Sequence, residues 1–268
     1  EMQSSPLGCG LEGVLQYRHD VLSGILNGID PNEWNPATDR HLPANYDARN
    51  VAQVKPICKA ALQRELGLPQ DSTAPLLGFV GRLTDQKGID LVVDVMQRWL
   101  QTSDAQWAIL GTGQPQFHKA LKTLAERFPQ KVALRLEFSN PLAHRIEAGA
   151  DIFLMPSRFE PCGLNQMYSL RYGTVPLVRS TGGLADTIVG YDPLMPNPNA
   201  NGFAFQECSS LALSETLRQA CDLLRRGEVW QRLMSVGMHQ DWSWARSARQ
   251  YVELYQKTID RRNKEPSA

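Results

Sequence analysis

The chain has 268 residues, 28 of them basic and 28 acidic, so its formal net charge at pH 7 is zero. With 42% hydrophobic residues, it has the composition of a globular protein with one large domain or two small ones. The balanced charge and the lack of long Lys or Arg runs argue against nucleic-acid binding. No stretch approaches the roughly 20 apolar residues of a membrane span.

Five cysteines stand at positions 9, 58, 162, 208 and 221. Their spacing contains no C-x-x-C pair and no metal-ligand pattern, and an odd number of thiols cannot all pair as disulfides. We therefore expect a reducing compartment and no bound metal. The first ten residues, "EMQSSPLGCG", lack the charged and apolar regions of a signal peptide and read as a polar linker.

Residues 1–74 are rich in turn formers and predict loops around short elements, with one helix near Val54–Leu66. From Pro75 onward, short apolar runs alternate with amphipathic segments of about 10–15 residues, which predicts βαβ units around a doubly wound parallel sheet. The predicted strands lie in "PLLGFVG", "QWAILG", "VALRLEF", "DIFLMPS", "VPLVRS" and "GFAF". Further helices are predicted near 209–226, 228–239 and 243–260.

Ligands of such a sheet bind beyond the carboxyl ends of the strands. The first of these loops, "GRLTDQKG" at 81–88, places Arg82 and Lys87 five residues apart beside a helix start, which suits a diphosphate. Two solvated surface cations in a turn fit the same spacing. The second loop, "GTGQPQ", has Gln116 where a dinucleotide fingerprint needs its third glycine, so it gives little support to a nicotinamide or flavin cofactor.

Two later loops carry an aromatic residue and an acid. Phe138 ends a predicted strand, where it can stack on a nucleobase, although a buried core position is the commoner outcome for phenylalanine. In "SRFEPCGLNQ", Glu160 precedes a helix whose first amides, at Gly163, Leu164 and Asn165, can hold phosphate or sugar oxygens. Glu160 itself fits two roles, facing a sugar that gains positive charge or complementing the helix dipole.

Two further features have open interpretations. The loop "RSTGGLADT" at 179–187, with Thr181 and Gly182, fits phosphate or sugar contact and a plain glycine-rich turn equally well. His144 lies within a predicted helix, and we expect it to pack or cap rather than to catalyse.

Four stretches match one family nearly word for word: "SGILNGIDPNEWNPATD", "GRLTDQKGIDL", "AHRIEAGADIFLMPSRFEPCGLNQMYSLRYGTVPLVRSTGGLADT" and "DWSWARSARQYVELY". From about Gly8 to about Tyr255, the chain resembles the C-terminal half of bacterial glycogen synthases and plant starch synthases, which are retaining glucosyltransferases of GT-B architecture. The resemblance implies a linker segment packing on the domain over 1–74, a Rossmann-like nucleotide-sugar domain over 75–240, and a C-terminal helix over 241–268 that returns toward an N-terminal domain.

The resemblance also implies an activity, the transfer of glucose from ADP-glucose to the non-reducing end of an α-1,4-glucan with retention, without a cofactor. It implies three catalytic residues, with Arg82 and Lys87 binding the donor diphosphate and Glu160 contacting the glucosyl unit. The donor-binding residues that it implies are Asn27 at the sugar, Phe138 at the adenine, Gly163, Leu164 and Asn165 at the phosphates, and Thr181 and Gly182 in the same cleft.

The chain departs from the family pattern in two ways. Tyr168 stands where many retaining GT-B enzymes have a second glutamate, a change that the synthase branch tolerates. The family's N-terminal domain, which supplies a Lys-x-Gly-Gly-Leu donor loop and most of the acceptor-binding face, is not in this chain. We therefore expect the isolated chain to be inactive or weakly active in glucan synthesis.

The resemblance implies a bacterial cytoplasmic location, or a plastid if the source is a plant or alga, with no nucleic-acid or membrane partner. Two alternatives stay open at this point. One is a non-catalytic nucleotide- or glucan-binding module of the same fold. The other is a GT-B glycosyltransferase with another donor, such as UDP-glucose.

Overall fold

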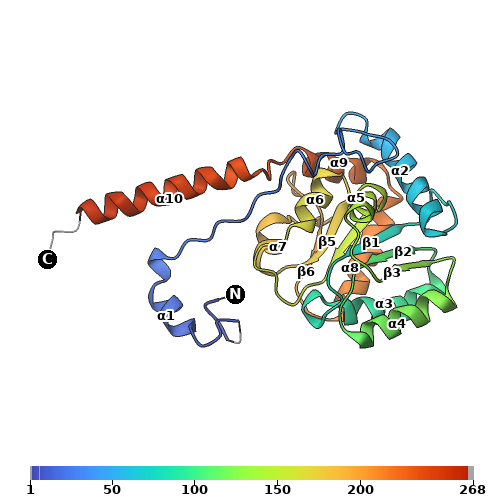
Figure 1. The fold of residues 1–268 in the computed structure, drawn as a ribbon, viewed down its shortest axis with the longest axis horizontal. Helices are drawn as coiled ribbons and strands as arrows, with labels where there is room; N and C mark the ends of the chain where they lie inside the picture. Colours follow the sequence, from blue (N-terminus) through green and yellow to red (C-terminus); the bar gives the residue numbers. More distant parts are fainter. Residues whose placement is uncertain (1, 6, 265–268) are drawn as a thin grey trace. The chain divides into compact units, whose positions relative to one another are not determined.

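The structure is a computed structural model, and it describes residues 2–5 and 7–264. Its central feature is a six-stranded sheet in which all neighbouring strands run parallel (Figure 1). The strand order is β3-β2-β1-β4-β5-β6, that of a doubly wound nucleotide-binding sheet. The strands are β1 (Leu76–Val80), β2 (Gln106–Leu110), β3 (Val132–Arg135), β4 (Ile152–Met155), β5 (Val175–Arg179) and β6 (Phe203–Phe205).

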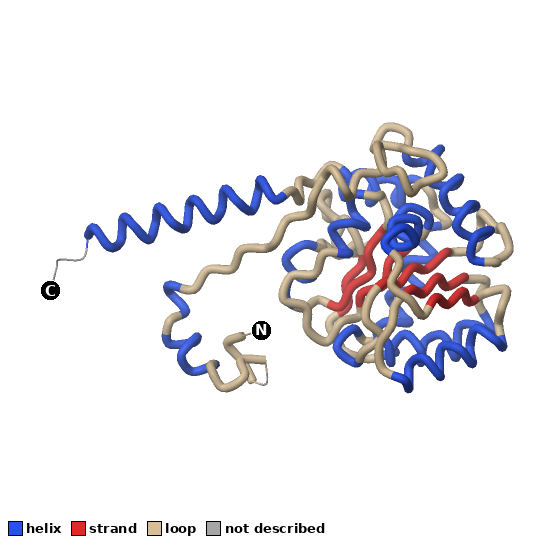
Figure 2. Tube along the Cα trace, in the orientation of Figure 1, coloured by secondary structure: helices blue, strands red, loops and turns tan. Residues whose placement is uncertain are grey.

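Helices cover both faces of this sheet (Figure 2). On one face, α3 (Ile89–Thr102) packs against α4 (Pro115–Arg127) and α8 (Ser210–Leu224). The elements of the other face are α2 (Val51–Leu66), α5 (Asn140–Gly149), α6 (Asn165–Arg171) and α9 (Glu228–Met238), and the short helix α7 (Gly182–Thr187) follows β5. Strands covered on both sides must be apolar throughout, which explains their continuous hydrophobic runs. The predicted α/β class is confirmed.

Phe138 is a correction to the sequence prediction. The strand β3 ends at Arg135, so Phe138 lies three residues beyond it, in a loop, with 93% of its side chain exposed. The last residue pair between the neighbouring strands is Leu110 with Arg135, and the apolar pattern beyond that point has no strand to pair with. Phe138 therefore neither ends a strand nor belongs to the core.

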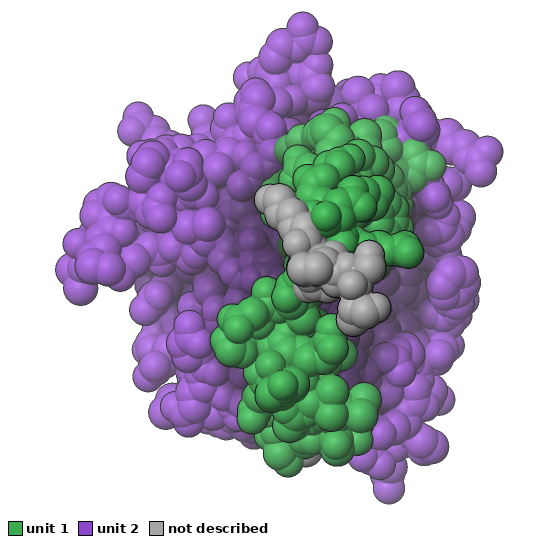
Figure 3. Space-filling view, turned by 90° about the vertical axis from the view of Figure 1, so that its left-hand side faces the viewer, with its two compact units in different colours: residues 1–31, 241–268 green, residues 32–240 purple. Residues whose placement is uncertain are grey.

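The sheet and its helices form one of two compact units, residues 32–240 (Figure 3). The other unit consists of residues 1–31 and 241–268 and contains α1 (Glu12–Tyr17) and α10 (Trp244–Lys264). Within it, the Ile29 amide donates to the Trp242 carbonyl at 2.8 Å, and the Ser247 hydroxyl donates to the Leu26 carbonyl at 2.8 Å. The domain boundaries expected from the sequence, at residues 75 and 241, stay a prediction. Among the described helices, none is both long and apolar enough to cross a bilayer.

Two buried ionisable side chains lie between the helices of one face. Lys55 on α2 donates to the Ala148 carbonyl at 2.8 Å and to the Thr174 hydroxyl at 2.5 Å, and burial lowers its pKa to about 8. Glu147 on α5 accepts a hydrogen bond from the Ser169 hydroxyl at 2.7 Å. Burial raises the pKa of Glu147 to about 8, so this carboxyl is mostly protonated in the folded chain at pH 7.

We predict that Glu147→Gln removes a pH dependence of stability. Between its ordinary pKa of 4.5 and its folded pKa of about 8, Glu147 is protonated in the folded chain and ionised in the unfolded one. Its contribution to stability therefore falls as pH rises through this window. From pH 5.5 to 7.5, the wild type should lose about 1–3 kcal/mol more unfolding free energy than Glu147→Gln.

Urea unfolding at both pH values measures this difference. Glu126→Gln, at an exposed position on α4, is the matched control and should follow the wild type. Parallel pH dependence of the wild type and Glu147→Gln would contradict the assignment.

Candidate functional site

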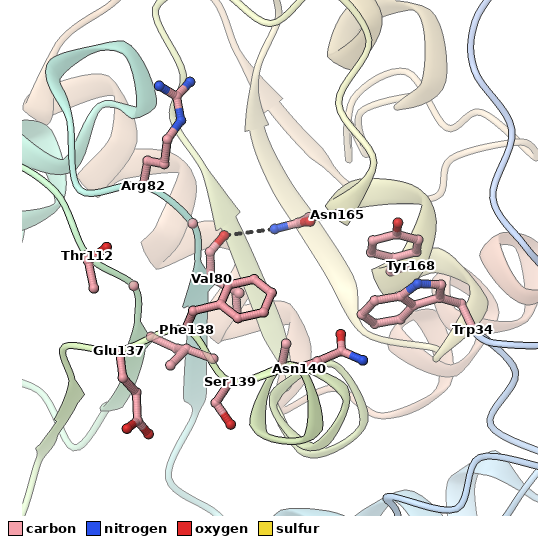
Figure 4. A pocket seen from close by; sticks show the side chains of 14 residues that line it. Trp34, Val80, Arg82, Thr112, Glu137, Phe138, Ser139, Asn140, Asn165 and Tyr168 are labelled. Atoms are coloured by element: carbon pink, nitrogen blue, oxygen red, sulfur yellow. Dashed lines mark hydrogen bonds between the residues drawn. The ribbon is translucent and has the colours of Figure 1, made fainter.

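The carboxyl ends of β1, β2 and β3 border a cavity of about 310 Å³ (Figure 4). Arg82 follows β1, Thr112 follows β2, and Phe138 follows β3 in its lining. Asn165 and Tyr168 of α6 form another part of the lining. An exposed aromatic ring beside a cavity that Arg82 also lines suits a ligand with a flat apolar part and an anionic part.

An aromatic stack forms one wall of this cavity. The indole of Trp34 lies 3.7 Å from the Tyr168 ring and 3.8 Å from the His144 ring, with interplanar angles of 10° and 12°. His144 Nδ1 and the Tyr172 hydroxyl donate to the same carboxylate oxygen of Asp39, at 2.7 Å and 2.6 Å. Burial would raise the pKa of Asp39, but these hydrogen bonds outweigh it and lower that pKa. The wall is therefore anchored on a buried carboxylate.

His144 packs in the interior, as expected, whereas Trp34 and Asp39 were not predicted to be part of the site. Both lie in "NEWNPATDR", a stretch without helical or strand periodicity. No local pattern assigns them a partner, and the only signal that could have marked them is the match of this stretch to the family.

The predicted catalytic residues Lys87 and Glu160 are in direct contact. Lys87 Nζ lies 2.5 Å from Glu160 Oε2, and the Ser157 hydroxyl donates to the same oxygen at 3.1 Å. Glu160 is only 7% exposed, so its charge requires such partners. This ion pair does not line the 310 Å³ cavity, whereas Arg82 does. The loop over residues 81–88 joins the two parts of the site.

Ionic and backbone contacts hold the loop that carries Glu160. Arg158 pairs with Asp90 of α3 through two hydrogen bonds of 2.7 Å and 2.6 Å. Burial would raise the pKa of Asp90, but the hydrogen bonds and charge of Arg158 lower it. Arg179, at the end of β5, donates from Nε to the Ser157 carbonyl at 2.7 Å. The loop is therefore fastened to the elements on both sides of it.

Two glycines allow helix starts to approach this loop closely. Gly88 has a φ of 67°, and a Cβ there would lie 2.1 Å from the Pro156 carbonyl oxygen. At Gly183, a Cβ would lie 2.0 Å from the Cys162 carbonyl oxygen, and the Gly183 amide donates to the Glu160 carbonyl at 2.9 Å. The first turns of α3 and α7 thus pack directly on the chain segment around Glu160.

The other residues predicted to bind the donor lie at helix starts or in the second unit. Gly163 and Leu164 immediately precede α6, Thr181 precedes α7 and Gly182 begins it. Asn27 belongs to the unit of residues 1–31 and 241–268.

Asn165, the first residue of α6, donates from its side chain to the Val80 carbonyl at 2.8 Å and so ties α6 to the end of β1. In the part of the chain that the structure describes, no group of three or more His, Cys, Asp or Glu side chains could hold a metal ion.

Comparison with known proteins identifies relatives by sequence. The family model described as glycosyl transferases group 1 matches residues 65–226. The chain is 50% identical to a glycogen synthase of Thioalkalivibrio sulfidiphilus, over 97% of the chain and 54% of that protein. It is 48% identical to a glycogen synthase of Rhodopirellula baltica, over 97% of the chain and 52% of that protein. The chain thus spans about half the length of these curated relatives.

Solved structures agree with the sequence matches. The catalytic domain of starch synthase IV from Arabidopsis thaliana, bound to ADP and acarbose, superposes with a TM-score of 0.88 and 37% identity, over 97% of this chain and 54% of that one. A glycosyltransferase from Rickettsia africae shares the fold at a TM-score of 0.66 and 17% identity, over 92% of this chain and 61% of that one. The resemblance to glycogen and starch synthases is therefore confirmed.

We predict that Gly88→Ala destabilises the fold more than Gly67→Ala does. Both glycines have positive φ, but a Cβ at Gly67 would meet nothing within 4 Å. Gly67→Ala should therefore cost only the backbone strain, about 1–2 kcal/mol. Gly88→Ala adds the clash with Pro156, worth about 1–3 kcal/mol more. Urea unfolding compares the two variants, and equal costs would contradict the close approach of α3 to the loop.

Proposed function

The chain belongs to the glycosyl transferases group 1 family, and from that premise we propose that it is the donor-binding half of a bacterial cytoplasmic glycogen synthase. The proposed reaction transfers glucose from ADP-glucose to the non-reducing end of an α-1,4-glucan with retention. The similarity of the chain to glycogen synthases and to a starch synthase bound to ADP supports this assignment. The observation that carries it is the Lys87–Glu160 pair next to a cavity lined by Arg82 and Phe138.

In this proposal the donor lies along the two parts of the site. The adenine occupies the cavity between Phe138 and the aromatic wall, where flat apolar surfaces favour a base. The diphosphate extends toward Arg82 and Lys87. Its oxygens also accept hydrogen bonds from the amides that precede and begin α6, at Gly163, Leu164 and Asn165.

The glucosyl unit then lies at Glu160, with Thr181 and Gly182 in the same cleft, and the expected contact of Asn27 with the sugar stays a prediction. Cleavage of the glycosidic bond makes the sugar positive and the leaving diphosphate more negative. Glu160 opposes the first charge, while Lys87 and Arg82 oppose the second, so stabilisation acts on both sides of the breaking bond. Lys87 contacts Glu160 at 2.5 Å, so the two opposite charges lie next to each other at the proposed point of bond cleavage.

The glucan acceptor is assigned mainly to the part of the synthase that this chain does not contain. The chain covers 54% of its Thioalkalivibrio relative. The cleft of a two-domain transferase needs both walls to exclude water and to orient the acceptor. We therefore expect the isolated chain to bind the donor but to transfer glucose slowly or not at all.

We predict that the 268-residue chain binds ADP and ADP-glucose more tightly than UDP. Replacement of Arg82 or Lys87 by alanine removes one charged contact to the diphosphate, so each variant should bind ADP about 10- to 100-fold more weakly. Isothermal titration calorimetry measures these affinities. Lys119→Ala removes one exposed positive charge on α4 and is the matched control, which should bind ADP like the wild type.

Tighter binding of UDP than of ADP would replace the proposed donor by a uridine nucleotide sugar. Wild-type affinity for ADP in both Arg82→Ala and Lys87→Ala would remove the proposed diphosphate site.

A further inference from the structure

We propose that Gln86 is a positioning residue that orients the guanidinium of Arg82 toward the donor and couples it to the loop carrying Glu160. The inference rests on the proposed function, because it takes Arg82 to be a ligand of the donor diphosphate. Gln86 lies between Arg82 and Lys87 in the chain, within the 3-10 turn η2 (Asp85–Lys87) that leads into α3.

Gln86 makes three hydrogen bonds, one within its own loop and two to the loop after β4. Its side-chain oxygen Oε1 accepts from Arg82 Nη2 at 2.7 Å, within the loop after β1. Its side-chain nitrogen Nε2 donates to the Phe159 carbonyl at 3.4 Å, and its main-chain oxygen accepts from the Arg158 amide at 2.8 Å. Phe159 and Arg158 directly precede Glu160, in the loop after β4. One residue therefore connects Arg82, which lines the cavity, to the loop that carries Glu160.

The chemistry of these contacts requires a carboxamide. An arginine side chain only donates hydrogen bonds, and a peptide carbonyl only accepts them. The amide of Gln86 meets both needs because it presents an acceptor to Arg82 and a donor to Phe159. A glutamate would keep an oxygen at Arg82 but would place a second oxygen against the Phe159 carbonyl. A methionine has a similar length and provides neither contact.

Arg82 depends on this contact for its orientation. Its side chain is exposed, and its hydrogen bond to Gln86 is the only one that the guanidinium makes to other described residues. A free arginine side chain loses about 2 kcal/mol of rotamer entropy when it is fully fixed. Because Gln86 already restricts the guanidinium in the free chain, Arg82 loses less rotamer entropy when a ligand binds.

A neutral partner also leaves the charge of Arg82 available. The ammonium of Lys87 is paired with the Glu160 carboxylate, with Nζ 2.5 Å from Oε2. The amide of Gln86 carries no charge and does not neutralise Arg82. The guanidinium thus keeps a full positive charge for an anionic ligand while it is held in place. Gln86→Glu would convert this arrangement into a second ion pair.

The test is calorimetric titration of the 268-residue chain with ADP and, separately, with adenosine. Gln86→Met should bind ADP about 3- to 10-fold more weakly than the wild type, the effect of one side chain that must now be ordered on binding. Gln86→Glu should bind ADP more weakly still, because its carboxylate competes with the diphosphate for Arg82. Adenosine, which has no phosphate, should bind both variants as it binds the wild type. Gln116→Met, at an exposed glutamine of α4, is the matched control.

A double-mutant cycle with Arg82→Ala separates positioning from a general structural role. If Gln86 acts through Arg82, Gln86→Met should not weaken ADP binding further in the Arg82→Ala background. If Gln86 only stabilises the loops, it should weaken ADP binding equally in both backgrounds, which would overturn the inference. The ratio of ADP to adenosine affinity is measured within each variant, and Gln86→Glu alone decides the question if Gln86→Met does not fold.

The two proposals fail in different ways. A wild-type ratio of ADP to adenosine affinity in the Gln86 variants, together with weak ADP binding by Arg82→Ala, would overturn the role of Gln86 and leave the proposed function standing. Wild-type ADP affinity in Arg82→Ala alone would remove the premise of the Gln86 role and leave Lys87 as the proposed diphosphate ligand. No ADP binding by the wild type, or wild-type ADP affinity in both Arg82→Ala and Lys87→Ala, would overturn the proposed function as well.

Discussion

The parallel pairing of β1 with β4 is the constraint on which the candidate site depends. These strands are far apart in the chain, yet Leu77 pairs with Ile152 and Gly78 with Phe153 at the centre of the sheet. The loop after each strand therefore begins next to the loop after the other. The contact of Lys87 with Glu160 and the bridge through Gln86 both cross this junction. Strand order thus brings together charges that local sequence keeps separate.

The helices and strands could be predicted because each is encoded by the spacing of apolar residues within a short stretch of sequence. The helix α3 has Ile89, Val92, Val93, Met96 and Leu100 at helical spacing, and all five are buried. The same alternation of strands and helices placed Arg82, Lys87 and Glu160 in loops at the carboxyl edge of the sheet. Their direct contacts were beyond prediction from spacing, because those contacts depend on which strands are neighbours.

The positions of Phe138 and Trp34 could not be predicted, because they depend on contacts between segments that are distant in the sequence. The apolar pattern of "VALRLEF" continues past Arg135, but β2 ends at Leu110 and offers no further backbone partner. Strand length is thus set by the neighbouring strand, and Phe138 becomes an exposed loop residue instead of a strand end. The stack of Trp34 on Tyr168 joins an irregular segment to a helix, and no periodicity encodes such a contact.

The position of Trp34, in the segment before α2, determines where the chain can be cut without loss of the cavity. The strands, Arg82, Lys87 and Glu160 all lie after residue 75, so a protease cut at that point would leave the sheet and its charged loops in one piece. The same cut would separate Trp34 and Asp39 from the rings and hydroxyl that they contact. A ligand bound against the intact aromatic wall should therefore protect the segment before α2 from proteolysis. The smallest fragment that keeps the whole cavity begins before Trp34, well upstream of the first strand.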